Sequence, residues 1–255
     1  DNLTLNDFTL TLGDNSSDLT VENAITIDNS TEGILTGGAD LSLGALTLSA
    51  GDVTSTGGIV SLSGGGQLSG AGILDVSGST WTLGGDFEKS NGTLTISQTD
   101  LELKDSIKLT SNQALNFETL NLNLHTLTLG SSDSDLTVQN AITIEQNNEG
   151  ISTGDADLIL NESQTIYEQG SITSTGGIIS LQKGGELYGS GILDISGSIW
   201  TLGGDFEKSN ETTLTMSGTN LVLDNNSTLT SNEALSFDNL TLNDFTLTLG
   251  DNSSD

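Results

Sequence analysis

The strongest constraint on this chain is that it repeats itself over long distances. Residues 1–18, DNLTLNDFTLTLGDNSSD, return unchanged as residues 238–255, an offset of 237 residues. A weaker repeat lies inside that period, because SDLTVENAITI at 17–27 matches SDLTVQNAITI at 134–144. Such repeats are typical of stacked units, in which each unit buries its apolar face against the next. We therefore expect a repeat architecture.

The weaker repeat divides the period into two halves. WTLGGDFEKSN at 81–91 returns at 200–210, offset by 119 residues, whereas the preceding match is offset by 117. Two additional residues fall most simply in NESQTIYEQGS, where the halves stop resembling each other, and loops tolerate such insertions. We expect residues 1–117 and 118–237 to be two half-repeats of one continuous rod, with 238–255 beginning the next unit.

The apolar pattern within each half has a period of two. Runs such as LTL at 10–12, ITI at 25–27 and LEL at 101–103 alternate apolar with polar residues, which predicts strands with one buried face. Clusters of Gly, Asn, Asp and Ser separate the runs and supply turns. The chain has no proline, so every residue can donate to a β-ladder. Helical spacing is nowhere sustained, and we expect almost no helix.

Sandwiches and closed barrels also contain many short strands, but neither requires a long-range repeat. Similar strands recur here about every 19–24 residues, a spacing that suits one turn of a three-sided coil. We predict an all-β, right-handed parallel β-solenoid with about 10–12 coils in each 237-residue unit. Leu19, Leu41, Val60 and Trp81 should form one row of inward side chains.

The charge balance excludes several partners. The chain has 35 acidic residues against five lysines and no arginine, and its net charge is -30. Nucleic acid is therefore excluded, because phosphate contacts need cationic side chains. We also expect no membrane insertion, since no apolar run reaches the length of a span. Cysteine is absent, which excludes a disulfide scaffold. No secretion signal opens the chain, so we expect any export signal to lie outside this segment.

Candidate catalytic groups are few. His125 is the one histidine, and as a general base or metal ligand it would need partners that the sequence does not show, so a turn or surface position is the alternative. Three acidic pairs are close in sequence: Asp14 with Asp18, Asp133 with Asp135, and Asp155 with Asp157. Paired carboxylates serve glycosidases and calcium sites, but 35 acids in 255 residues produce such pairs by chance. We expect no enzyme and no cofactor, with calcium binding only adventitiously.

The best-conserved block between the halves gives a candidate surface patch. It carries the same side chains twice: Trp81, Asp86, Glu88 and Lys89, then Trp200, Asp205, Glu207 and Lys208. These eight residues could form a repeated patch that binds carbohydrate or a partner. The alternative is an inward tryptophan followed by a solvated loop in which the lysine offsets two acids. Thr-x-Thr pairs, as at 9–11 and 93–95, invite comparison with ice-binding solenoids, but their spacing is irregular.

The glycine-rich runs carry a family resemblance. GGGQLSGAGILDVSGSTWTLGGDF at 64–87 and GGELYGSGILDISGSIWTLGGDF at 184–206 resemble the repeat regions of large bacterial secreted adhesins, both filamentous-haemagglutinin-like exoproteins and autotransporter passenger domains. The resemblance implies a right-handed β-helix, export from a bacterium, and a role as a stalk, fibre or adhesive surface. It transfers no functional residue.

The functional expectation follows from the repeat and this resemblance. We expect a structural unit of an extracellular or cell-surface fibre or adhesin stalk. Its partners would be neighbouring copies of the same repeat, joined head to tail, and host or surface glycans. The alternatives are a glycan-binding or ice-binding solenoid and, after these, a polysaccharide-degrading enzyme.

Overall fold

The computed structural model describes residues 3–146, 148–209 and 211–250, and every helix or strand assigned within these ranges is a β-strand. The chain divides into two compact units, Asp1–Asn123 and Leu124–Asp255. Each unit is a parallel β-solenoid, and the two together contain about 11 coils of about 21 residues. The predicted all-β solenoid is therefore confirmed.

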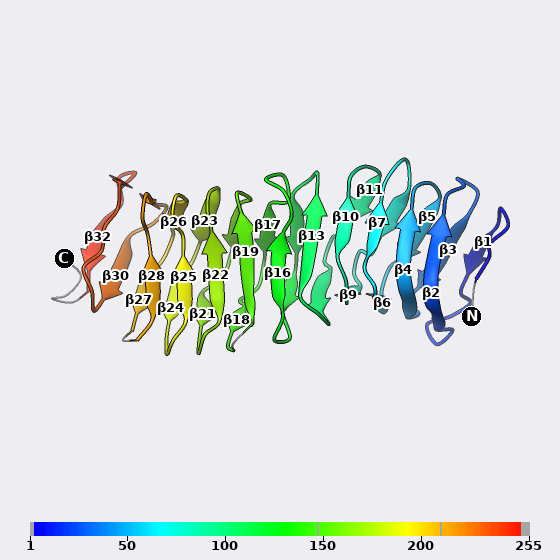
Figure 1. The fold of residues 1–255 in the computed structure, drawn as a ribbon, viewed down its shortest axis with the longest axis horizontal. Coiled ribbons are helices and arrows are strands. Elements are labelled where there is room, and N and C mark those ends of the chain that lie inside the picture. The colour runs from blue at the N-terminus through cyan, green and yellow to red at the C-terminus, as the bar shows by residue number, and fades with distance from the viewer. Residues whose placement is uncertain (1–2, 147, 210, 251–255) are drawn as a thin grey trace. The chain divides into compact units, whose positions relative to one another are not determined.

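In the first unit, three rows of parallel strands surround one core (Figure 1). The first row contains β1 (Thr9–Thr11), β3 (Gly33–Gly37), β5 (Asp52–Ser55), β8 (Ile73–Asp75) and β11 (Thr93–Thr95). The second row contains β2 (Leu19–Ile27), β4 (Leu41–Leu48), β6 (Ile59–Leu62), β9 (Thr80–Leu83), β12 (Asp100–Leu103) and β15 (Thr119–Asn121). The third row contains the second halves of β2 and β4, then β7 (Gly66–Leu68), β10 (Phe87–Lys89) and β13 (Ile107–Ser111), which β14 (Leu115–Phe117) follows in the chain.

The second unit has the same three-row plan. Its first row contains β16 (Thr126–Leu129), β19 (Gly150–Gly154), β22 (Ser171–Ser174), β25 (Ile192–Asp194) and β28 (Thr213–Thr215). Its second row contains β17 (Leu136–Val138), β20 (Leu158–Leu160), β23 (Ile178–Leu181), β26 (Ile199–Leu202), β29 (Asn220–Leu223) and β31 (Asn239–Thr241). Its third row contains β18 (Thr143–Ile144), β21 (Gln164–Ile166), β24 (Gly185–Leu187), β27 (Phe206–Lys208), β30 (Ser227–Ser231) and β32 (Leu247–Leu249).

The predicted inward row is confirmed in the first unit. Leu41 pairs with Leu19 in the preceding coil and with Val60 in the following coil, and Val60 pairs with Trp81. Leu41, Val60 and Trp81 are fully buried, while Leu19 in the first coil is half-buried. Each such burial contributes about 1.5–3 kcal/mol. Identical positions in successive coils thus build one continuous apolar ladder.

Glycine is required where the second row turns into the third. Gly65 joins β6 to β7 with φ at +74°, a conformation that side chains with a Cβ rarely adopt. A Cβ at this position would also overlap the backbone carbonyl of Asp86 in the next coil. Gly184 occupies the same turn in the second unit, with the same φ and the same conflict at Asp205. The close approach of successive coils therefore selects glycine here.

Candidate functional site

The residues that begin the repeated 18-residue segment form the last coil of the second unit. Leu240 of β31 pairs with Leu221 of β29, and Leu249 of β32 pairs with Leu229 of β30. Both pairings are parallel and in register with the earlier coils. Residues 238–250, which match residues 1–13, are thus stacked as a further coil, and residues 251–255 of the repeat lie outside the described residues. We call residues 238–250 the open coil.

The open coil leaves apolar side chains uncovered. Leu240, Leu242 and Leu249 are 49%, 42% and 49% exposed. The equivalent residues 120 positions earlier, Leu120, Leu122 and Leu129, are 7%, 3% and 5% exposed. Leu240 pairs with Leu221 in the same register in which Leu120 pairs with Leu101, so the exposure differs although the residue type and this pairing are the same. Among the described strands none pairs with the outer edge of β31 or β32, so the open coil presents a free strand edge beside exposed leucines.

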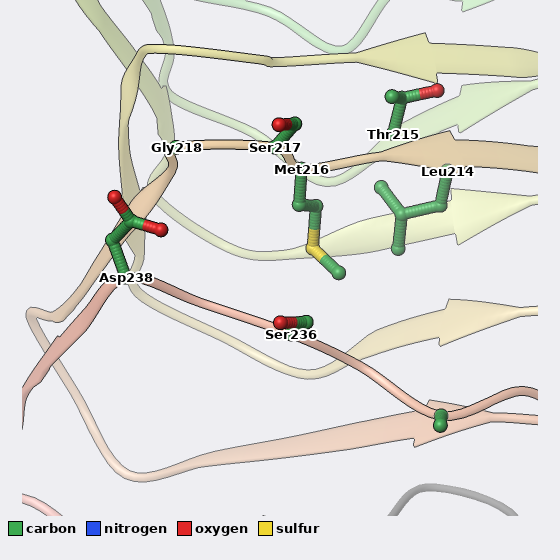
Figure 2. A pocket seen from close by; sticks show the side chains of 8 residues that line it. Leu214, Thr215, Met216, Ser217, Gly218, Ser236 and Asp238 are labelled. Carbon is green, nitrogen blue, oxygen red and sulfur yellow. The ribbon is translucent and has the colours of Figure 1, made fainter.

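A hollow of about 380 Å³ lies beside the open coil (Figure 2). Its lining is Leu214, Thr215, Met216, Ser217, Gly218, Ala234, Ser236 and Asp238. Figure 2 shows the side chain of Met216 reaching toward Ser236 on the neighbouring segment. Residues 234–236 form no strand, whereas the equivalent segment of the first unit contributes to β14. The hollow marks a coil that is incompletely closed, and its lining offers one carboxylate and no nucleophile–base pair.

The structure separates the eight residues of the predicted surface patch. Trp81, Lys89, Trp200 and Lys208 are buried, at 0%, 4%, 0% and 3% exposure. These four therefore cannot belong to a surface patch. The alternative is right in placing the tryptophans inward, but it is wrong in placing Lys89 and Lys208 in a solvated loop. The physical reason is the strand phase: in Phe-Glu-Lys the glutamate points outward, so the residues on both sides of it point inward.

The acidic half of that patch does lie on the surface. Asp86 and Glu88 line a shallow hollow of about 330 Å³ together with Lys108 and Thr110. Asp205 and Glu207 line the equivalent hollow in the second unit, with a volume of about 420 Å³. The two aspartates also have a structural use, because Asp86 accepts a hydrogen bond from the Lys108 amide at 2.7 Å, and Asp205 accepts one from Thr228 at 2.6 Å.

Three aspartates from the acidic pairs weighed above as glycosidase or calcium ligands accept a backbone N–H of the next coil: Asp18, Asp135 and Asp157. The carboxylate of Asp18 accepts the backbone N–H of Asp40 at 3.0 Å, and Asp40 accepts that of Ile59 at 2.8 Å. Asp135 and Asp157 repeat the arrangement in the second unit. Hydrogen bonds from Ser16 and Ser17 lower the pKa of Asp14. Within the described ranges, no group of three or more His, Cys, Asp or Glu side chains is arranged to hold a metal ion.

His125 lies immediately before β16 and is half-buried. Its backbone carbonyl accepts a hydrogen bond from Gly150 at 3.2 Å. The residue occupies the position of Phe8 in the first half and Phe245 in the open coil. Its place in the repeat is therefore one that an aromatic ring usually fills.

Sequence reasoning missed a pair of stacked tyrosines. The rings of Tyr167 and Tyr188 lie 5.6 Å apart at an interplanar angle of 28°, and Tyr167 is 39% exposed. A hollow of about 300 Å³ beside them is lined by Glu145, Gln146, Tyr167 and Glu168. Partial burial, followed by the carboxylates of Glu186 and Glu207, raises the pKa of Tyr188. The sequence contained a signal for this contact, because the two tyrosines of the chain are separated by one coil length and therefore fall at neighbouring positions in successive coils.

Comparisons with protein-family models, with curated proteins and with solved structures found no match to this chain. The described residues include no helix long and apolar enough to cross a membrane. The open coil and the tyrosine hollow are therefore the two features of the molecule that point to a function.

Proposed function

We propose that this chain is a structural repeat of an extracellular fibre or adhesin stalk on a bacterial surface, and that successive units continue one solenoid through the open coil. The observation that carries this proposal is the open coil itself. Residues identical to the start of the 237-residue period stack in register on β29 and β30. A following unit would then extend the two ladders that end in β31 and β32.

The energetics of the open coil favour continuation. Covering Leu240, Leu242 and Leu249 to the level of their first-half equivalents would remove apolar surface from water, which is favourable in proportion to its area. A further coil would also satisfy the N–H and C=O groups along the free edges of β31 and β32. The contact is heterologous, because one end of a unit meets the opposite end of the next, and such contacts propagate instead of closing.

The acidic, arginine-free surface suits a non-enzymatic fibre. A net charge of -30 keeps the side faces of neighbouring rods apart, while the ends remain apolar. Lateral aggregation is thereby opposed and axial growth is not. The resemblance of the glycine-rich runs to secreted adhesin repeats supports the extracellular placement.

The test is a chain of two periods, residues 1–237 followed directly by residues 1–255. Its matched control carries a flexible Gly/Ser linker of about 20 residues between the same two copies, which breaks the register. Hydrogen exchange should show strong protection of the Leu240 and Leu249 amides in the direct fusion and weak protection in the control. Equal protection of these amides in the two chains would show that the units do not form a continuous solenoid, and the proposal would fail.

Glycan binding at the tyrosine hollow is a second candidate function. The exposed ring of Tyr167 offers an apolar face to a sugar ring, and Glu145 and Glu168 offer acceptors for its hydroxyl groups. Screening the chain on a glycan array, with Tyr167→Ala against Tyr167→Phe, tests this function. Binding that is lost in the alanine variant and kept in the phenylalanine variant supports it. Binding that both variants retain excludes this site.

A further inference from the structure

Each unit buries one lysine in its apolar core at the same position. Lys208 pairs with Leu187 and Ser231 in the neighbouring coils, and Lys89 pairs with Leu68 and Ser111. The Lys208 side chain is 1% exposed. A buried ammonium group is costly unless its donors are satisfied, and burial lowers the pKa of Lys89. In the first unit burial therefore favours the neutral amine of Lys89, and a neutral lysine amine is a nucleophile.

Each buried amine faces a side-chain amide of the next coil. Lys208 Nζ donates to Asn232 Oδ1 at 3.1 Å, and Lys89 Nζ donates to Asn112 Oδ1 at 2.6 Å. In the first unit, Nδ2 of Asn112 donates to the Ser90 carbonyl at 2.8 Å, which fixes the amide with its carbonyl toward the amine. The arrangement holds the amine nitrogen within hydrogen-bond distance of the amide oxygen, and therefore next to the electrophilic carbonyl carbon.

The two units differ in a third group. Glu233 Oε2 lies 3.3 Å from Lys208 Nζ, and the Glu233 side chain is 65% exposed. The equivalent residue of the first unit is Gln113, whose Nε2 donates to the Leu94 carbonyl at 3.2 Å. The second unit therefore holds an amine, an amide and a carboxylate together. The first unit holds the amine and the amide without the carboxylate, so it cannot move a proton in the same way.

We propose that Lys208 and Asn232 join covalently as an intramolecular amide cross-link between two successive coils, and that Glu233 carries the proton for this reaction. Glu233 first accepts a proton from Lys208, leaving a neutral amine. The lone pair on Nζ attacks Cγ of Asn232, and the carbonyl electron pair moves to Oδ1. A proton passes through Glu233 to Nδ2, the Cγ–Nδ2 bond breaks, and ammonia leaves as the carbonyl re-forms.

This reaction balances without any oxidant, reductant or cofactor, because an amine and a primary amide become a secondary amide and ammonia. Each group is supplied by the chain itself, so folding would be enough to bring the reactants together. The product ties the coil of β27 to the coil of β30 at the end of the unit. It also removes the buried positive charge, because the amide nitrogen is neutral.

The intact mass of the purified chain tests the proposal. We expect a mass below that of the sequence by one molecule of ammonia, and a tryptic digest in which Lys208 is uncut and linked to Asn232. Loss of ammonia by asparagine cyclisation would leave Lys208 open to trypsin, so the digest distinguishes the two. An intact mass equal to that of the sequence, in chain that is folded by circular dichroism, would overturn the proposal.

The first unit supplies matched variants. Glu233→Gln copies the natural residue at position 113, and we expect it to restore the full mass without unfolding the chain. Gln113→Glu supplies the missing carboxylate beside Lys89 and Asn112, and we expect it to remove a second ammonia. A link that survives Glu233→Gln would overturn the assigned role of Glu233. None of these outcomes depends on whether units stack end to end.

Discussion

The ring of Trp81 meets the ring of Phe87 edge to face, with centroids 4.9 Å apart and an interplanar angle of 87°. Trp200 and Phe206 repeat the contact at 5.1 Å and 85°. In both units the tryptophan comes from the second row and the phenylalanine from the third. The pair therefore holds two rows of one coil together across the turn between them, beyond the area that each ring buries.

Removing the first of these tryptophans should be costly. Trp81→Ala leaves a large cavity, and we expect the free energy of unfolding to fall by about 3–5 kcal/mol. Trp81→Phe should cost less, because it also removes an indole N–H that has no partner among the described residues. Chemical denaturation followed by circular dichroism measures both. Ile59→Ala, at a 42% exposed position, is the control; equal losses for Ile59→Ala and Trp81→Ala would contradict the packing argument.

The turn glycines allow strain and steric overlap to be separated. Gly37 has φ at +59° and open space where a Cβ would lie, so Gly37→Ala should cost about 1 kcal/mol from conformational strain alone. Gly65→Ala adds overlap with the Asp86 carbonyl, and we expect a further loss of about 1–3 kcal/mol. Thermal and chemical unfolding of both variants measures the difference between their losses of unfolding free energy. Equal losses would show that successive coils move apart freely and that the overlap has no cost.

One position offers a stabilising change. Leu124 has φ at 70° and is 51% exposed, whereas Asp7 and Asp244 fill the same turn at 68° and 67°. Asparagine and aspartate tolerate this conformation better than leucine. Leu124→Asn should raise the free energy of unfolding by up to about 1 kcal/mol. Leu124→Val, which is β-branched, should lower it. If Leu124→Val were more stable than Leu124→Asn, the backbone of residue 124 would not be strained.

The buried lysine of the first unit predicts a pH dependence. Burial lowers the pKa of Lys89 below its ordinary value of 10.5. In the window between the folded pKa and 10.5, the unfolded chain binds more protons than the folded chain, so stability rises with pH. Denaturant unfolding at a series of pH values approaching 10.5 from below should show this rise. Lys89→Met should flatten it, while Lys183→Met, at a 60% exposed side chain, should leave it unchanged.

Much of the fold could be read from the sequence because a solenoid is built from local pattern and repetition. The row through Leu19, Leu41, Val60 and Trp81 was predictable, since period-two alternation gives the inward face and the coil length gives the neighbour. The same alternation also predicts that Lys89 points inward, because it stands two residues after an inward phenylalanine. Reading the charge of the side chain instead of its phase put that lysine on the surface.

The candidate sites depended on side-chain contacts between coils, which are about 21 residues apart in sequence. The stacking of Tyr167 on Tyr188 and the approach of Lys208 to Asn232 require the true register of each coil. One inserted residue changes that register, and the sequence marks an insertion only as a place where the resemblance between halves weakens. Asp18 and Asp135 show the same limit, because the partner of each carboxylate is a backbone amide of the next coil.

By itself the sequence determined the repeat, the strand class, the parallel solenoid and the acidic surface, since each follows from residue type and spacing along the chain. Only the tertiary structure decided which polar side chains enter the core, which aromatic rings meet, and which leucines stay uncovered in the open coil. The physical reason is that each of these properties depends on how closely and in what register neighbouring coils pack. Backbone hydrogen bonding and packing throughout the unit set that spacing, so a short stretch of sequence does not determine it.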